Sequence, residues 1–216
     1  MRYPHVIWDF DGTLVDTYPA MAEAARRTLL LCGIHEPADE IMAQMKISIT
    51  HALQYYGTKY PLSKGFVAEY EATRKELERE WSRPFPGVAV LCKRIVAAGG
   101  SNYICTHRGE SLWPMMECCG LSGYFADATI SADKFPRKPD PAAVLHLLAK
   151  HAIAPERAIM VGDREIDILA GKNAGIAACF VWGGECAAAD FVAEDAGALE
   201  GILCQQRNWG DGGRGN

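Results

Sequence analysis

Several features typical of other protein classes are missing from this sequence of 216 residues. No apolar run reaches the roughly 18–20 residues that cross a bilayer, and the apolar run near the N-terminus is too short for the core of a signal peptide. No cluster of lysine and arginine marks a surface for nucleic acid or anionic membrane, and the net charge is -5. We therefore expect a cytoplasmic protein whose partners are neither nucleic acid nor a membrane.

Cysteine pairs with metal-binding spacing are also missing. The eight cysteines are scattered, and none forms a CxxC pair. This argues against a zinc site, and a disulfide framework is more typical of small secreted chains. We expect free thiols, buried as small hydrophobic side chains.

Short apolar runs alternate with helix-length segments along most of the chain. Strands are predicted at residues 6–8, 102–105, 128–130, 158–161 and 177–181, and helices at about 88–98, 112–119, 141–151 and 166–173. Continuous apolar strands that alternate with helices indicate a parallel sheet covered on both faces. The expected fold class is therefore α/β, with a Rossmann-like parallel core.

One long stretch, from about residue 18 to residue 84, contains helical patterns and no convincing strand. Apolar and aromatic side chains recur there at helical spacing, as in Phe66, Tyr70, Leu77 and Trp81. We expect a core of residues 1–16 and 85–206 and an inserted α-helical cap domain of residues 17–84. The glycine-rich tail, residues 207–216, is expected to be disordered.

Polar side chains follow four of the predicted strands, at the edge where parallel α/β sheets bind their ligands. They are Asp9 and Asp11 after the first strand, Thr106, His107 and Arg108 after the second, Lys138 in the loop after the third, and Asp163 and Asp167 after the fourth. Taken alone, the first pair could be a solvated turn with a helix cap. The four groups together indicate one site.

Four carboxylates at one edge need a cation, because two unit charges about 4 Å apart repel by roughly 4 kcal/mol at an effective dielectric constant of 20. Oxygen-only ligands favour Mg²⁺. Lys138 is followed by Pro139 and stands just before a predicted helix, where an ammonium suits an anion such as phosphate. A metal, an ammonium, a hydroxyl and a spare carboxylate describe a phosphoryl-transfer site.

The motifs "DFDGT", "YICT", "KPDP" and "GDREID" occur in this order and span nearly the whole chain. With them, the sequence resembles the haloacid dehalogenase (HAD) superfamily, in the group of phosphoglycolate-phosphatase-like and β-phosphoglucomutase-like members with a helical cap. The resemblance implies that Asp9 is the nucleophile and Asp11 the general acid and base. It implies that Thr106 and Lys138 bind phosphate oxygens.

The resemblance also implies a metal site and a cap function. Mg²⁺ would be held by Asp9, by the backbone carbonyl of Asp11 and by Asp163, with Asp167 in support. The cap would close over the site and select the substrate, so that Lys46 and His51 are candidate substrate contacts.

The sequence departs from the family after the second motif, where many relatives have asparagine. His107 and Arg108 are therefore candidate substrate ligands, or loop residues turned to solvent. Residues 16–17 and 84–87 are candidate hinges between core and cap.

The expected function is Mg²⁺-dependent hydrolysis of small phosphorylated metabolites, of the phosphoglycolate or sugar-phosphate type, through an aspartyl-phosphate. A phosphosugar mutase or a pyrophosphatase on the same scaffold stays open, as does a non-catalytic binding module. The expected assembly is a monomer or a weak homo-oligomer.

Overall fold

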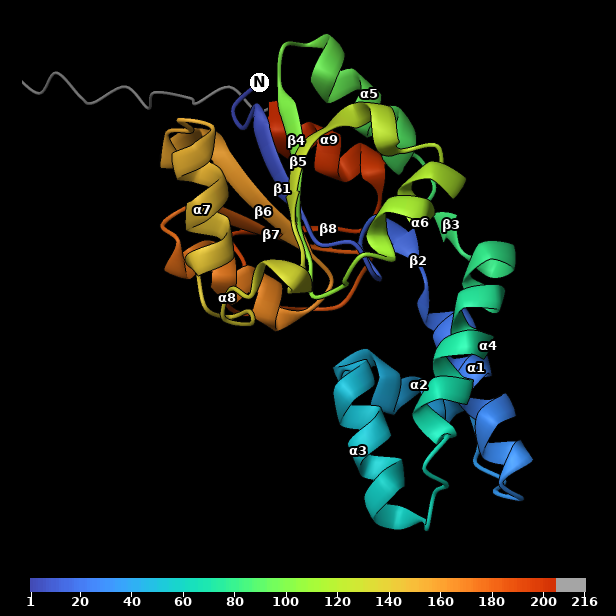
Figure 1. Ribbon diagram of the computed structural model, residues 1–216. Helices are drawn as coiled ribbons and strands as arrows, with labels where there is room; N and C mark the ends of the chain where they lie inside the picture. Colours follow the sequence, from blue (N-terminus) through green and yellow to red (C-terminus); the bar gives the residue numbers. More distant parts are fainter. Residues whose placement is uncertain (205–216) are drawn as a thin grey trace, which may run out of the picture.

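The computed structural model describes residues 1–204, and its centre is a six-stranded parallel sheet (Figure 1). The strands are, in spatial order, β5 (Phe125–Thr129), β4 (Ser101–Cys105), β1 (His5–Trp8), β6 (Ala158–Gly162), β7 (Ala177–Val181) and β8 (Phe191–Ala193). Strand β1 lies in the middle, with Trp8 level with Ile104 of β4 and Val161 of β6. This register places Asp9 at the centre of the carboxyl-terminal edge of the sheet.

Helices cover both faces of the sheet. One face packs against α5 (Val88–Ala97), α6 (Leu112–Cys118) and α9 (Ala196–Cys204), and the other against α7 (Ala142–Lys150) and α8 (Glu165–Asn173). Side chains alternate along a strand, so that Val6 and Trp8 enter the first apolar cluster and Ile7 enters the second. The predicted α/β class with a doubly covered parallel sheet is confirmed.

Four helices between β1 and α5 form a second body with its own apolar cluster (Figure 1). They are α1 (Tyr18–Leu31), α2 (Ala38–Ile47), α3 (Ile49–Lys59) and α4 (Phe66–Trp81). Pro19 stands in the first turn of α1, where its missing N–H costs nothing, and the Ser48 hydroxyl accepts the His51 N–H at the start of α3. The separate cluster supports the proposal of a cap comprising residues 17–84.

The two crossings between these bodies lie side by side as a short antiparallel pair. Strand β2 (Val15–Asp16) leads into the cap, and β3 (Arg83–Pro84) leads out of it. Gly87, with φ of 83°, then turns the chain into α5. The predicted hinge residues therefore lie in and just beyond this pair.

Most predicted strands lie within the observed ones, but several features differ. The prediction of a strand at residues 128–130 is wrong at its end, because β5 spans Phe125–Thr129 and Ile130 opens a short turn. Strands β2, β3 and β8 and helix α9 were not predicted, and β3 lies at the end of the stretch that was expected to contain no strand. The predicted disordered tail lies outside the described residues.

The eight cysteines are free, as predicted, but only three of them are buried: Cys92, Cys105 and Cys179. Within residues 1–204, no helix is both long and apolar enough to cross a membrane.

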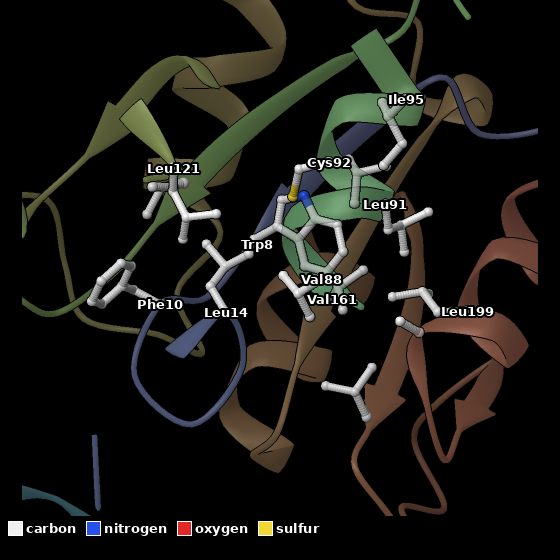
Figure 2. Packing of buried hydrophobic residues seen from close by; sticks show 14 of the residues in the cluster. Trp8, Phe10, Leu14, Val88, Leu91, Cys92, Ile95, Leu121, Val161 and Leu199 are labelled. Atoms are coloured by element: carbon white, nitrogen blue, oxygen red, sulfur yellow. The ribbon is translucent and has the colours of Figure 1, made fainter. Parts of the chain in front are cut away.

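A polar contact holds β1 against β4 in the middle of the apolar core. Trp8 packs beside Cys92, Val88 and Val161 (Figure 2), and its indole Nε1–H donates to Asn102 Oδ1 at 3.0 Å. The Asn102 amide in turn donates to the backbone carbonyls of Cys92 and Tyr124, both at 3.0 Å. Since Trp8 and Asn102 are fully buried, water cannot replace these hydrogen bonds.

Replacing Asn102 by leucine should therefore lower the free energy of unfolding by about 1–3 kcal/mol, because the buried indole N–H loses its acceptor. Urea denaturation measures this loss. The Trp8→Phe/Asn102→Leu double variant, which has no indole N–H to satisfy, should be less destabilised than the sum of the two single variants. Simple additivity would contradict the contact.

Candidate active site

Lys138 connects the ends of β1 and β4 with the first turn of α8. Its Nζ donates to Asp9 Oδ1 and to the Cys105 carbonyl, both at 2.9 Å, and lies 2.6 Å from Asp167 Oδ1. All three charged side chains are almost completely buried. Burial alone would raise the pKa of Asp9, but Lys138 and Arg164 outweigh it and hold that pKa below its usual value. The first aspartate is therefore kept ionised.

Asp163 lies close to the carboxylates of Asp9 and Asp167. Its oxygens accept the hydroxyls of Thr13 (2.9 Å) and Tyr18 (3.0 Å). Burial, followed by the charges of Asp9 and Asp167, raises the pKa of Asp163 to about 7. One oxygen from each of the three carboxylates lies within 4.8 Å of the others. Such a cluster fits a divalent cation, whose charge would relieve the repulsion that raises this pKa.

Glycine is required at position 12, where the chain turns away from β1. The φ of Gly12 is +80°, and a Cβ there would come within 2.5 Å of Asp163 Oδ2 and collide with the Tyr18 ring. The glycine of the "DFDGT" motif thus lets the chain pass close to Asp163 and Tyr18.

Asp11 faces the cap rather than the other carboxylates. Its Oδ1 accepts the Thr17 hydroxyl at 2.8 Å, and the Arg108 Nε lies 3.1 Å from both of its oxygens. Arg108 also donates two hydrogen bonds, of 2.8 and 2.9 Å, to the Glu78 carboxylate of α4. Arg108 and Glu78 are both buried. Removing one partner of a buried charge pair of this kind destabilises the folded protein by about 3–5 kcal/mol.

The loop after β4 places Thr106 and His107 differently. Thr106 is buried, and its hydroxyl accepts the Arg108 N–H at 3.1 Å and lines the cavity at Asp9. His107 Nε2 accepts the Lys138 backbone N–H at 2.9 Å, so His107 supports the loop that carries Lys138. This role was not among the alternatives predicted for His107.

A cavity of about 230 Å³ lies between the core loops and the cap. Asp9, Asp11, Thr106, His107 and Arg108 line it from the core. The cap contributes residues of α1, α4 and the α2–α3 junction: Tyr18, Met21, Met45, Ser48, Ile49, Thr50, Glu71 and Arg74.

Two predicted cap contacts lie outside this cavity. Lys46 lines a neighbouring hollow with Asp163 and Arg164. His51 is exposed on α3, where its Nε2 lies 2.9 Å from Gln44 Oε1. The structure therefore brings together the motif residues of the core and does not bring His51 to them.

Sequence reasoning missed three residues of this site: Tyr18, Glu78 and Arg164. Glu78 follows Leu77 on a helix rich in charges, and no spacing distinguishes it from its exposed neighbours. Tyr18 begins the cap and matches no motif residue. Of the three, only Arg164 could have been noticed in the sequence, because it is a cation inside the acidic "GDREID" motif.

Comparison with known proteins agrees with this geometry. Residues 6–181 match the family of haloacid dehalogenase-like hydrolases. The chain belongs to this family. It is 33% identical over 220 residues to phosphoglycolate phosphatase of Vibrio cholerae, covering 90% of this chain and 94% of the relative. It is 32% identical over 185 residues to phosphoglycolate phosphatase of Agrobacterium fabrum, covering 80% and 78%. The chain is thus a HAD-type phosphatase.

Solved structures agree on the fold. A hydrolase from Streptococcus pneumoniae is 32% identical, with a TM-score of 0.64, and covers 82% of this chain and 92% of its own. A HAD family hydrolase from Deinococcus radiodurans, solved with phosphate and sodium, has a TM-score of 0.79. At 20% identity and coverages of 94% and 95%, it shows the shared fold alone.

The pKa of His107 gives a pH prediction. Burial, with Lys138 and Arg137 nearby, lowers this pKa to about 3, whereas an unfolded histidine titrates near 6.5. Below about pH 6.5, His107 binds a proton in the unfolded state but stays neutral in the folded state. The protein should therefore lose stability as the pH falls from about 6.5 towards 3, by at most about 1 kcal/mol per pH unit after solvent screening.

The control is His107→Gln, whose amide oxygen can replace Nε2 as the acceptor without titrating. Urea denaturation between pH 7 and pH 5 should show a shallower pH dependence for this variant than for the wild type. Parallel pH profiles would contradict the low pKa.

Proposed function

We propose that the protein is a Mg²⁺-dependent phosphatase of small phosphorylated metabolites that works through an aspartyl-phosphate on Asp9. The observation that carries this proposal is the state of Asp9: a buried carboxylate, kept ionised by Lys138 at 2.9 Å, with a cavity in front of it. A carboxylate of this kind is prepared to act as a nucleophile.

The residues present fit the metal. Asp9 and Asp163, with the Asp11 carbonyl or with Asp167, offer only oxygen ligands, as Mg²⁺ prefers. When bound, Mg²⁺ would offset the repulsion between the phosphate dianion and the carboxylates.

The side chains of this site can account for both halves of the reaction. Asp9 attacks phosphorus, so that an Oδ–P bond forms and the P–O bond of the leaving group breaks. Asp11 donates a proton to the leaving oxygen, and then accepts one from the water that attacks the phosphorus of the aspartyl-phosphate. In that second step the Oδ–P bond to Asp9 breaks, which releases inorganic phosphate and restores the Asp9 carboxylate. Thr106 and Lys138 hold phosphoryl oxygens, and Lys138 balances the growing negative charge.

Phosphoglycolate is our first candidate substrate, because the relatives named above are phosphoglycolate phosphatases. A cavity of about 230 Å³ suits a molecule of this size. Sugar phosphates, nucleotides and pyrophosphate are the alternatives, and Lys46 is proposed to influence the choice from the adjoining hollow.

The test is release of inorganic phosphate from p-nitrophenyl phosphate and from phosphoglycolate. We expect activity with Mg²⁺, its loss in excess EDTA and its return when Mg²⁺ is restored. Asp9→Asn should lower kcat at least ~10³-fold, because an amide is not a nucleophile here, while the thermal unfolding profile shows a folded protein. Full activity of Asp9→Asn, or activity that survives chelation, would contradict the mechanism. A mutase would instead return the phosphoryl group to a sugar phosphate.

A further inference from the structure

The guanidinium of Arg164 lies close to Asp9 and makes no short hydrogen bond with the described residues. Its Nη2 lies 3.4 Å from Asp9 Oδ2, its Nη1 lies 3.5 Å from the Ile47 carbonyl, and its Nε lies 3.8 Å from Asp167 Oδ2. The Nε is buried and has no hydrogen-bond partner in the part of the chain that the structure describes. All three distances exceed those of strong charge-assisted hydrogen bonds, which are about 2.7–2.9 Å.

The other arginines along the cavity differ from Arg164. Arg108 uses all its nitrogens, at distances of 3.2 Å or less, on Asp11, Glu78 and Ser111. Arg74 also has a buried Nε without a hydrogen-bond partner, but both of its Nη atoms pair with Glu71 and Glu78 of its own helix at 3.0 Å or less. Arg137 is exposed and lies 3.1 Å from His107 Nδ1. Apart from the exposed Arg137, Arg164 is therefore the arginine of this group whose hydrogen-bonding capacity is least used, with a half-buried side chain and a buried Nε.

The position of Arg164 connects the nucleophile with the cap. One nitrogen faces Asp9, another faces Ile47 at the end of α2, and the side chain lines the cavity at Asp9 together with Ser48 and Thr50. A guanidinium presents a planar fork that matches two oxygens of a phosphoryl or carboxylate group. An oxyanion in the cavity could supply the acceptors that Arg164 lacks.

We propose that Arg164 is a substrate-binding residue that donates paired hydrogen bonds to an oxyanion of the substrate. The oxyanion is either the phosphoryl group that is transferred or a second anionic group on the leaving alcohol. This inference rests on the proposed phosphatase function, and it adds a residue to which the sequence assigned no role.

The experiment compares Arg164→Gln with Arg94→Gln, a charge-matched control on α5. Arg94 is exposed and pairs with Glu200, away from the cavity. The measurements are the Kd of inorganic phosphate by calorimetry in the presence of Mg²⁺, and kcat and KM on two substrates. p-Nitrophenyl phosphate carries no second anion, whereas phosphoglycolate carries a carboxylate.

We expect Arg164→Gln to raise KM by about 10- to 100-fold, the range for losing hydrogen bonds to a charged group. If Arg164 holds the transferred phosphoryl group, both substrates and the phosphate Kd are affected. If it holds a second anion, only phosphoglycolate is affected. Arg164→Lys keeps the positive charge that faces Asp9 and Asp167 but lacks the planar fork, so it should recover only part of the lost binding. It also serves as the folded variant if Arg164→Gln does not fold.

Two failures are distinguishable. If the wild type hydrolyses phosphate esters and Arg164→Gln matches it in both KM values and in the phosphate Kd, the inference about Arg164 is wrong and the proposed function stands. If the wild type hydrolyses neither ester and binds no phosphate, the proposed function itself fails.

Discussion

The balance of buried charge around Lys138 is the constraint on which the rest of the site depends. Two carboxylates as close as Asp9 and Asp167 would repel by several kcal/mol even at an effective dielectric constant of about 20. The ammonium of Lys138, within 2.9 Å of both, offsets that repulsion. Lys138 comes from the loop between β5 and α7, so this balance also fixes that loop against β1 and β4. His107 then accepts the backbone N–H of Lys138. As a result Asp9, the proposed nucleophile, stays charged.

The cap participates in the site through several polar contacts, and these link its position to Asp11, the proposed acid–base group. Tyr18 reaches Asp163, Thr17 reaches Asp11, and Glu78 reaches Asp11 through Arg108. A displacement of α4 would separate Glu78 from Arg108 and leave buried charges without partners. The position of the cap and the geometry of Asp11 are therefore energetically coupled. A leaving group that contacts the cap acts on the same network.

The core of the site could be predicted from the sequence because the ends of the strands follow from short-range apolar patterns. Asp9, Thr106 and Asp163 each follow an apolar run directly, and parallel strands bring such ends together. Glu78 and Tyr18 could not be found in this way. Their contacts depend on how a helical cap sits on the core, and a helix period does not determine that arrangement. His107 was considered as a ligand or a solvated residue, whereas its actual role depends on the path of a loop 31 residues further along the chain.

The short strand β8 shows the same limit in the fold. Three residues, Phe191–Ala193, join the sheet through backbone hydrogen bonds to β7, and too few side chains alternate there to reveal a strand.

In the proposed reaction, Asp9 carries the phosphoryl group and Asp11 is needed to remove it. p-Nitrophenolate leaves without help from an acid, whereas the attacking water needs a base. In Asp11→Asn incubated with p-nitrophenyl phosphate and Mg²⁺, the phosphorylated enzyme should therefore accumulate. Acid quenching, borohydride reduction of the acyl phosphate and peptide mass spectrometry locate the modified residue. We expect modification of Asp9 and of no other carboxylate. Modification at another residue, or an unmodified protein, would show that Asp9 is not the nucleophile.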